Sequence, residues 1–140
     1  MQLYLPVAAL LPQSVPLYGA SVPAGFPSPA DDYKDSPLDL NRYLIRDAAS
    51  SFMVRVSGDS MADAGIHHGD LLVVDRGLPP LHGHIVLAAI DGAFTVKRLH
   101  RRDGRVALLA ENAAYAPLEL GGEQELCIWG VVTACVKRFT

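Results

Sequence analysis

Residues 85–99, with the sequence IVLAAIDGAFTVKRL, decide the fold class of this chain. Two apolar runs, rich in β-branched and aromatic residues, flank the dipeptide Asp91-Gly92, and such runs are typical of strands. A two-residue Asp-Gly connection favours a tight hairpin, because its glycine tolerates a positive φ. The stretch therefore predicts two adjacent antiparallel strands.

Short apolar runs of the same kind fill the chain from Tyr43 onward. They predict strands over 51–56, 71–75, 84–90, 93–100, 105–109 and 126–137. Residues 39–45 are compatible with one or two helical turns beginning near Asp39, or with a short strand. We expect residues 41–140 to form one mostly β, antiparallel domain, since a chain of 140 residues is too short for two comfortable cores.

The first forty residues differ from the rest, because Pro, Gly and Ser recur there without a sustained period. They predict an extended arm, residues 1–40, that lies on another surface. Prolines interrupt its apolar residues and no Lys or Arg precedes Lys34, which argues against a signal peptide. No later run approaches the roughly 18 to 20 apolar residues of a membrane span. We expect no membrane association and a cytoplasmic location.

The overall charge limits the range of partners. The formal net charge is −3, which supplies no strong basic field for gripping phosphates. We therefore expect no direct, sequence-specific binding of DNA by this chain alone.

The two cysteines, Cys127 and Cys135, both lie in the last predicted strand. A rise of about 3.3 Å per residue would hold them too far apart to pair with each other. We expect both to be small buried hydrophobes in a reducing compartment. Phe52, Met61 and Trp129 are likewise expected in the core rather than at a cofactor.

Ser60 stands in the sequence SGDSM, residues 57–61, directly after a predicted strand. The Gly and Asp before it permit a sharp turn that would expose the Ser60 hydroxyl. Most turns of this kind are purely structural. A serine hydroxyl is also a poor nucleophile until a neighbouring base takes its proton. A catalytic reading of Ser60 therefore requires a base elsewhere in the chain.

Lys97 is the candidate base. It precedes Arg98 in a predicted strand, so alternation directs the two cations to opposite faces and places Lys97 with Thr95 and Leu99. Most strand lysines simply extend their charge into solvent. A lysine that acts as a base needs its pKa lowered from about 10.4 toward 7 to 8, and desolvation in an apolar strand environment can supply that shift.

None of the five histidines stands out as an alternative base, because each lies near Gly, Asp or Arg in a predicted turn or strand end. His82 and His84 could share one strand face and bind a metal ion, but zinc would require further ligands that we do not find. The sequence contains no Gly-rich phosphate loop. We therefore expect no metal and no other cofactor.

Taken in order, these motifs resemble the LexA/UmuD family of self-cleaving serine–lysine peptidases. The nucleophile loop is SGDSM (57–61) and the base strand is FTVKRL (94–99), with 37 positions from Ser60 to Lys97. Between them lie GDLLVVD (69–75) and GHIV (83–86), and NAAYAP (112–117) and WGVV (129–132) follow. The resemblance implies a LexA C-terminal-domain-like antiparallel β domain with an extended N-terminal arm.

Residues 25–33 resemble the cleavage region of UmuD- and MucA-type members, and we expect no DNA-reading domain before them. The resemblance implies Ser60 as nucleophile, Lys97 as general base and the bond between Ala24 and Gly25 as the chain's own substrate. It also implies an oxyanion hole built from the backbone N–H groups of Asp59 and Ser60. Ala24 departs from the cysteine of UmuD itself, whereas Ala-Gly is the pair found in LexA and MucA.

The same resemblance implies partners. UmuD-like chains are homodimers, a RecA filament on single-stranded DNA stimulates their cleavage, and the shortened product joins a UmuC-like Y-family polymerase. Residues 25–140 are thus expected to act in error-prone translesion synthesis during the SOS response to DNA damage. A tethered arm is always near the cleft, so the chain would cleave itself at once without a restraint. We expect this restraint to be conformational, with the docked arm a minority population.

Two other functions fit parts of the sequence. A non-catalytic, β-rich interaction subunit would keep the fold and use the arm as a docking peptide, but it would need neither Ser60 nor Lys97. A membrane protease that resembles signal peptidase would use the same pair of residues, but it would need a membrane anchor that we do not find. Intact Ser60 and Lys97 therefore favour the self-cleaving peptidase.

Overall fold

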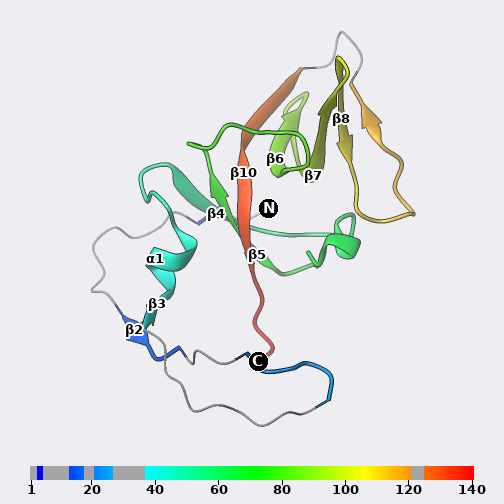
Figure 1. The fold of residues 1–140 in the computed structure, drawn as a ribbon. Helices are drawn as coiled ribbons and strands as arrows, with labels where there is room; N and C mark the ends of the chain where they lie inside the picture. Colours follow the sequence, from blue (N-terminus) through cyan, green and yellow to red (C-terminus); the bar gives the residue numbers. More distant parts are fainter. Residues whose placement is uncertain (1–2, 5–12, 18–20, 27–36, 121–124) are drawn as a thin grey trace.

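The computed structural model describes residues 3–4, 13–17, 21–26, 37–120 and 125–140. Their main feature is an antiparallel eight-stranded sheet in the order β1-β4-β5-β10-β6-β7-β8-β9 (Figure 1). Its strands are β1 (Leu3–Tyr4), β4 (Ser51–Arg55), β5 (Leu71–Asp75), β6 (Ile85–Ile90), β7 (Ala93–Arg102), β8 (Arg105–Leu109), β9 (Leu118–Glu119) and β10 (Leu126–Val136). The mostly β prediction is confirmed. All six predicted strands are present.

The described parts of the predicted arm contain only short elements. Strands β2 (Ser14–Val15) and β3 (Leu38–Asp39) form a separate two-stranded sheet, and β1 pairs with the edge of β4. Helix α1 (Leu40–Leu44) follows, capped by an Asp39 carboxylate oxygen that accepts the N–H of Asn41 at 3.0 Å. Of the two alternatives for residues 39–45, the helix forms. The domain boundary at residue 40 stays a prediction.

The predicted hairpin is present. Strands β6 and β7 pair with Ile90 opposite Ala93, and the two turn residues Asp91 and Gly92 have φ values of 49° and 82°. Two successive positive φ values match the right-handed twist of the flanking strands, which favours this turn in hairpins. Residues 103–104, Asp-Gly again with φ values of 55° and 73°, make the same connection from β7 to β8. The sequence analysis had not singled out this second turn.

Strand β10 lies at the centre of the sheet, between β5 and β6 (Figure 1). A Cβ atom at its Gly130 would lie 2.6 Å from the side chain of Val74, so the close approach of β10 to β5 requires glycine. Two groups of buried side chains form the core: Phe52, Val54, Met61, Ile66, Leu72, Val74 and Leu87 in the first, and Val86, Ala88, Leu99 and Leu108 in the second. The first group lies beneath the candidate site.

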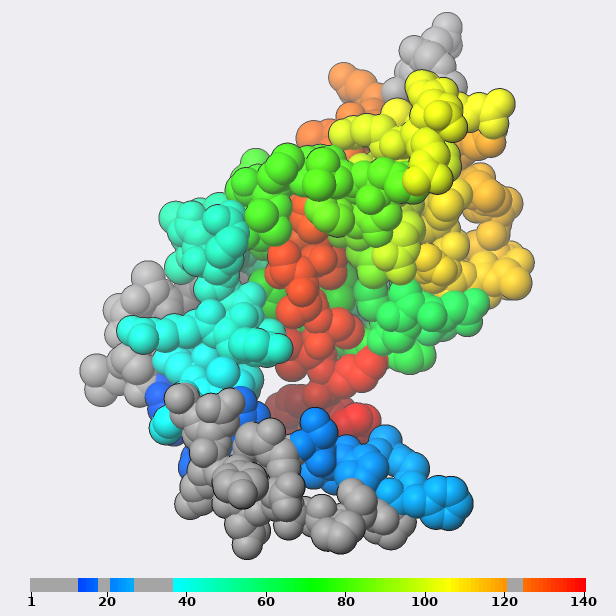
Figure 2. Space-filling model, viewed as in Figure 1, coloured from blue at the N-terminus to red at the C-terminus, as the bar shows by residue number. Residues whose placement is uncertain are grey.

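The prediction that both cysteines are buried is wrong, because Cys127 and Cys135 are exposed free thiols. In β10 the residues Leu126 and Ile128 pack against the second core group, so alternation turns Cys127 outward. Trp129, expected in the core, is 37% exposed, whereas Phe52 and Met61 are buried as predicted. Figure 2 shows part of β10, in red, at the molecular surface.

Within the described ranges, no helix has the length and apolar character needed to cross a membrane.

Candidate active site

The nucleophile loop leaves the end of β4 through a tight turn. The N–H of Val56 donates to the carbonyl of Asp70 at 2.8 Å, and Gly58 then adopts a φ of 90°, a conformation that favours glycine. The chain next passes Ser60 and enters the 3-10 helix η1 (Ala62–Ala64). Ser60 is partly buried rather than fully exposed. The Gly-Asp turn thus takes Ser60 out of β4, as predicted, but leaves it partly buried beside the core residue Met61.

Lys97 lies on β7 and reaches Ser60 from there, although three strands separate β7 from β4 in the order of the sheet. Its Nζ lies 2.9 Å from the Oγ of Ser60, 2.6 Å from the Oγ1 of Thr95 and 3.1 Å from the carbonyl oxygen of Val96. The structure thus brings together the two residues that sequence analysis paired across 37 positions. Alternation along β7 places Thr95 and Lys97 on the same face, as predicted.

The environment of Lys97 disfavours its charged form. The side chain is buried in the sheet, and no carboxylate of the described residues forms an ion pair with it. Desolvation by burial therefore lowers the pKa of Lys97 from its ordinary value. Two hydroxyls and a carbonyl satisfy its hydrogen bonds without supplying a compensating negative charge. A neutral Lys97 amine can accept the proton of the Ser60 hydroxyl.

An apolar cleft of about 620 Å³ opens at Ser60. Its walls include the apolar side chains Phe52, Val54, Val56, Met61, Leu87, Phe94, Val96 and Trp129. The Phe94 and Trp129 rings meet edge to face, with centroids 5.0 Å apart, and the Arg76 guanidinium lies 5.3 Å from the centre of the Trp129 ring. Such walls exclude water from a bound segment, which strengthens electrostatic interactions within the cleft. Trp129 thus belongs to the cleft and not to the core.

The bond between Ala24 and Gly25 is not in this cleft. Both residues are exposed, and none of the described arm residues lines the cleft. Nothing lies within 4 Å of the position where a Cβ of Gly25 would stand. The structure therefore joins the predicted nucleophile and base but leaves the predicted substrate bond outside their reach.

A segment that sequence analysis gave no catalytic role contacts the nucleophile loop. The Asn112 side-chain amide donates to the carbonyl of Asp59 at 2.9 Å, and the Tyr115 hydroxyl donates to the Asp59 carboxylate at 2.7 Å. The Glu111 N–H donates to the carbonyl of Ser60 at 2.9 Å. These contacts cross more than fifty residues of sequence, so neither local motif nor periodicity predicts them. They fix the peptide groups on both sides of the candidate nucleophile.

The rings of His82 and His84 accept hydrogen bonds from the backbone. The Nδ1 atom of His82 accepts the N–H of Arg101 at 3.1 Å, and Nδ1 of His84 accepts the N–H of Leu81 at the same distance. Among the residues that the structure describes, no three His, Cys, Asp or Glu side chains are grouped so that they could hold a metal ion.

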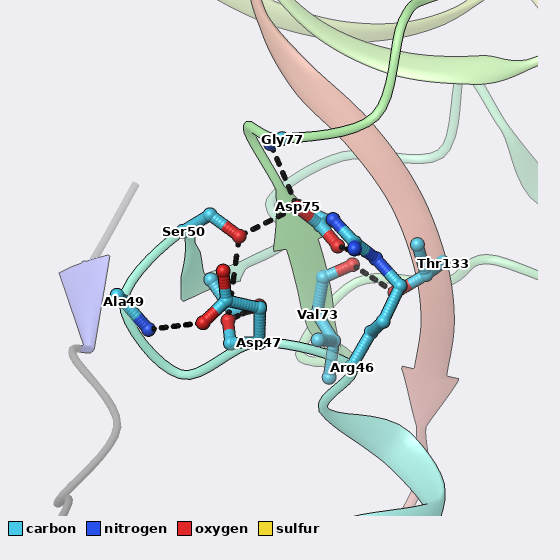
Figure 3. Close-up of polar contacts among 9 residues, drawn as sticks. Arg46, Asp47, Ala49, Ser50, Val73, Asp75, Gly77 and Thr133 are labelled. Atoms are coloured by element: carbon cyan, nitrogen blue, oxygen red, sulfur yellow. Dashed lines mark hydrogen bonds and ion pairs between the residues drawn. The ribbon is translucent and has the colours of Figure 1, made fainter.

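A second buried ionisable group, Asp75 at the end of β5, lies in a different environment (Figure 3). Its carboxylate accepts hydrogen bonds from Nε of Arg46 at 2.9 Å, from the hydroxyl of Ser50 at 3.0 Å and from the N–H of Gly77 at 2.7 Å. Burial alone would raise the pKa of Asp75, but these donors outweigh it and hold the pKa below its ordinary value. Asp75 therefore stays charged and ties the loop after α1 to the sheet.

Comparison with known proteins identifies relatives over most of the chain. The Peptidase S24-like family model matches residues 16–133. SamA of Salmonella typhimurium is 51% identical over 125 residues, which cover 89% of this chain and 86% of SamA. ImpA of Escherichia coli is 47% identical over 129 residues, covering 88% of this chain and 83% of ImpA. MucA of Escherichia coli is 46% identical over 121 residues, covering 86% and 82%. The resemblance to UmuD/MucA-type proteins is confirmed, and the chain belongs to the Peptidase S24-like family.

Proposed function

We propose that this chain is a serine peptidase that cleaves its own bond between Ala24 and Gly25, with Ser60 as nucleophile and Lys97 as general base. The observation that carries the proposal is the 2.9 Å contact between Nζ of Lys97 and Oγ of Ser60 at an apolar cleft. Burial of Lys97 lowers its pKa, which supplies the neutral amine that a base requires. Membership of a peptidase family supports the same chemistry.

The reaction begins with the arm docked in the cleft. Neutral Lys97 accepts the hydroxyl proton of Ser60 as Oγ attacks the carbonyl carbon of Ala24, and the backbone N–H groups of Asp59 and Ser60 stabilise the oxyanion. The protonated Lys97 then donates its proton to the nitrogen of Gly25 as the peptide bond breaks. Water, deprotonated by Lys97, hydrolyses the resulting ester between Ala24 and Ser60 and restores the enzyme.

Docking of the arm is the step that restrains this reaction. Ala24 and Gly25 are exposed in the structure, so the arm has to move before Ser60 can attack. A docked arm would cover the cleft and remove water from Lys97, which lowers its pKa further and favours the neutral base. A partner that binds the docked state more tightly would accelerate cleavage by shifting this population. In our proposal a RecA filament on single-stranded DNA is that partner.

The processed chain, residues 25–140, then acts as a cytoplasmic homodimer and as a subunit of an error-prone, UmuC-like Y-family polymerase in SOS mutagenesis. The similarity to SamA, ImpA and MucA supports this role. The net charge of −3 fits a chain that reaches DNA through protein partners rather than by gripping phosphates itself.

Incubation of the purified full-length chain at pH 7.5 and pH 10, followed by intact mass, tests the peptidase proposal. We expect a fragment that begins at Gly25, formed faster at pH 10 because more Lys97 is neutral there. Ser60→Ala should abolish the fragment, whereas Ser14→Ala, which removes an exposed arm hydroxyl, should not. If no cleavage occurs under either condition or with a RecA filament, the interaction subunit without catalysis becomes the better description.

The polymerase role requires a separate measurement. Residues 25–140 and the full-length chain should be compared for their ability to restore damage-induced mutagenesis in cells that lack their own UmuD-like protein. We expect residues 25–140 to restore mutagenesis without cleavage, and the full-length Ser60→Ala variant to fail. Equal activity of residues 25–140 and the full-length Ser60→Ala variant would show that cleavage does not control the polymerase.

A further inference from the structure

The segment 111–115 holds the nucleophile loop through hydrogen bonds at Asp59, Ser60 and Asp63. The carbonyl of Asp59 accepts both the Asn112 side-chain amide at 2.9 Å and the N–H of Ala62 at 3.1 Å. The next carbonyl, that of Ser60, accepts the N–H of Glu111 at 2.9 Å, and the N–H of Asp63 donates back to Glu111 at 2.7 Å. Each peptide group that flanks Ser60 is therefore anchored through its oxygen.

The anchored oxygen also fixes a hydrogen-bond donor. The carbonyl of Asp59 and the N–H of Ser60 belong to one planar peptide group, and no peptide bond among the described residues is cis. In a trans peptide the C=O and N–H bonds point in opposite directions. Holding the Asp59 oxygen with two donors therefore aims the Ser60 N–H to the other side, and hydrogen bonds on the oxygen also polarise the group and strengthen its N–H as a donor.

We propose that Asn112 is a positioning residue that holds the Ser60 N–H in the oxyanion hole. This inference rests on the proposed function, because it assigns a role within the same reaction. The orientation of the Asn112 amide is itself fixed, since its Oδ1 accepts the N–H of Ala114 at 3.0 Å while its Nδ2 donates to Asp59. A flipped amide would lose both bonds. Asn112 acts through the peptide group and does not contact the reacting atoms.

Two variants remove the donor in different ways. Asn112→Asp keeps the shape and the acceptor for Ala114 but replaces the amide with a carboxylate oxygen, and Asn112→Ser removes the amide without adding charge. Asn41→Asp is the charge-matched control, because Asn41 lies in the exposed helix α1, on the other side of the molecule from η1 in Figure 1. Each full-length chain is assayed for self-cleavage from pH 7 to pH 11, with thermal unfolding in parallel.

We expect the plateau rate at high pH to fall about 10- to 100-fold in both Asn112 variants, less than the loss of a whole oxyanion donor because Ala62 still holds the oxygen. The midpoint of the pH profile should stay at its wild-type value in Asn112→Ser, since this variant adds no charge and leaves Lys97 untouched. Reaction with diisopropyl fluorophosphate gives a second readout that needs no arm docking. Ser60 Oγ bonds to phosphorus, fluoride leaves, Lys97 takes the proton, and the phosphoryl oxygen occupies the hole. Its rate should fall in parallel.

Wild-type rates in both Asn112 variants would overturn the inference, and so would a shifted pH midpoint in Asn112→Ser or a loss of rate that equals the loss of folded protein. These results differ from failure of the proposed function. In that case the wild-type chain would neither release a fragment beginning at Gly25 nor become labelled at Ser60.

Discussion

Asp75 and Lys97 are both buried ionisable residues in the same sheet, yet their surroundings act on them in opposite ways. Asp75 is 1% exposed and Lys97 is 8% exposed. The carboxylate of Asp75 is paired with the Arg46 guanidinium and accepts two further hydrogen bonds, so its pKa lies below the ordinary value (Figure 3). Within the described ranges, the hydrogen bonds of Lys97 go to neutral oxygens alone, so desolvation lowers its pKa and favours the uncharged amine.

This difference separates a structural charge from an amine that can act as a base. A buried charge that has an opposite charge beside it stays ionised and stabilises the native state. A buried amine without such a partner destabilises the native state as long as it is protonated, and is correspondingly easy to deprotonate. The paired carboxylate of Asp75 anchors the loop after α1, whereas the buried amine of Lys97 lies beside Ser60.

The largest expected effect comes from replacing Lys97 by a neutral side chain of similar length. Lys97→Met should reduce the rate of self-cleavage at least about 10⁴-fold, since among the described residues no other base is hydrogen-bonded to the Ser60 hydroxyl. It should raise the free energy of unfolding at pH 7 by about 1 kcal/mol, because a buried and unpaired cation is removed. Intact mass and urea unfolding measure the two quantities. Loss of stability together with activity would show that Lys97 is a structural residue.

The opposite pattern, a loss of stability with little change in the cleavage rate, is expected for Asp75. Asp75→Asn keeps the shape but removes the charge, so it should lower the free energy of unfolding by about 2 kcal/mol through loss of charged hydrogen bonds to the buried site. The Arg46 side chain is 56% exposed and can return to water, which limits the loss. Cleavage by the folded protein should stay near the wild-type rate. Urea unfolding, with Glu119→Gln as an exposed control, measures the effect. An unchanged stability would refute the anchoring role.

The stability of the protein at acid pH should depend on the same Asp75 carboxylate. Because the native pKa of Asp75 is below its unfolded value, the unfolded chain binds the proton more readily, so this contribution is fully present above about pH 4 and is lost as the pH falls through the native pKa. The pKa of Asp70 is also lowered and adds a loss of the same sign. Urea unfolding from pH 7 to pH 2 should therefore show a shallower acid decline in Asp75→Asn. Parallel curves would contradict this account.

A subtler change tests the neutral contacts of Lys97. Thr95→Val removes the hydroxyl that lies 2.6 Å from Nζ and that favours the charged amine as an acceptor. The pH profile of self-cleavage should move to lower pH, while the plateau rate changes by less than about tenfold. The profile measured with Thr133→Val, on β10, serves as the control. A move to higher pH would mean that Thr95 mainly orients the amine.

The smallest effect is expected at the ion pair between Arg98 and Glu111, which joins β7 to the segment that braces Ser60. Its atoms are 2.7 Å apart, but about a third of each side chain is exposed, so solvent screens the pair. Glu111→Gln should cost at most about 1 kcal/mol in unfolding and a few-fold in cleavage rate. High salt should reduce the difference from wild type. A larger and salt-independent loss would indicate that the pair sets the spacing of Ser60 and Lys97.

Local rules predicted much of the fold. The apolar runs and the Asp91-Gly92 turn were sufficient to predict the six longer strands and the first hairpin, because alternation and turn preference depend on neighbours in sequence. They failed to predict that Cys127 and Trp129 are exposed. The packing of β10 in the sheet decides which of its faces meets the core, and local rules do not contain that information. The motifs predicted Ser60 and Lys97 as partners. They could not predict Asn112, whose bond to Asp59 spans more than fifty residues.

The sequence by itself determined the six longer strands, the nucleophile turn and the pair Ser60 and Lys97 as a hypothesis, since each is written in a short stretch of residues. Only the tertiary structure decided that Lys97 is buried without an ion pair to a described carboxylate, that Asp75 is paired with Arg46, and that the described arm residues lie outside the cleft. The physical reason is that a pKa is set by burial and by charges brought close in space, and packing across the sheet decides both.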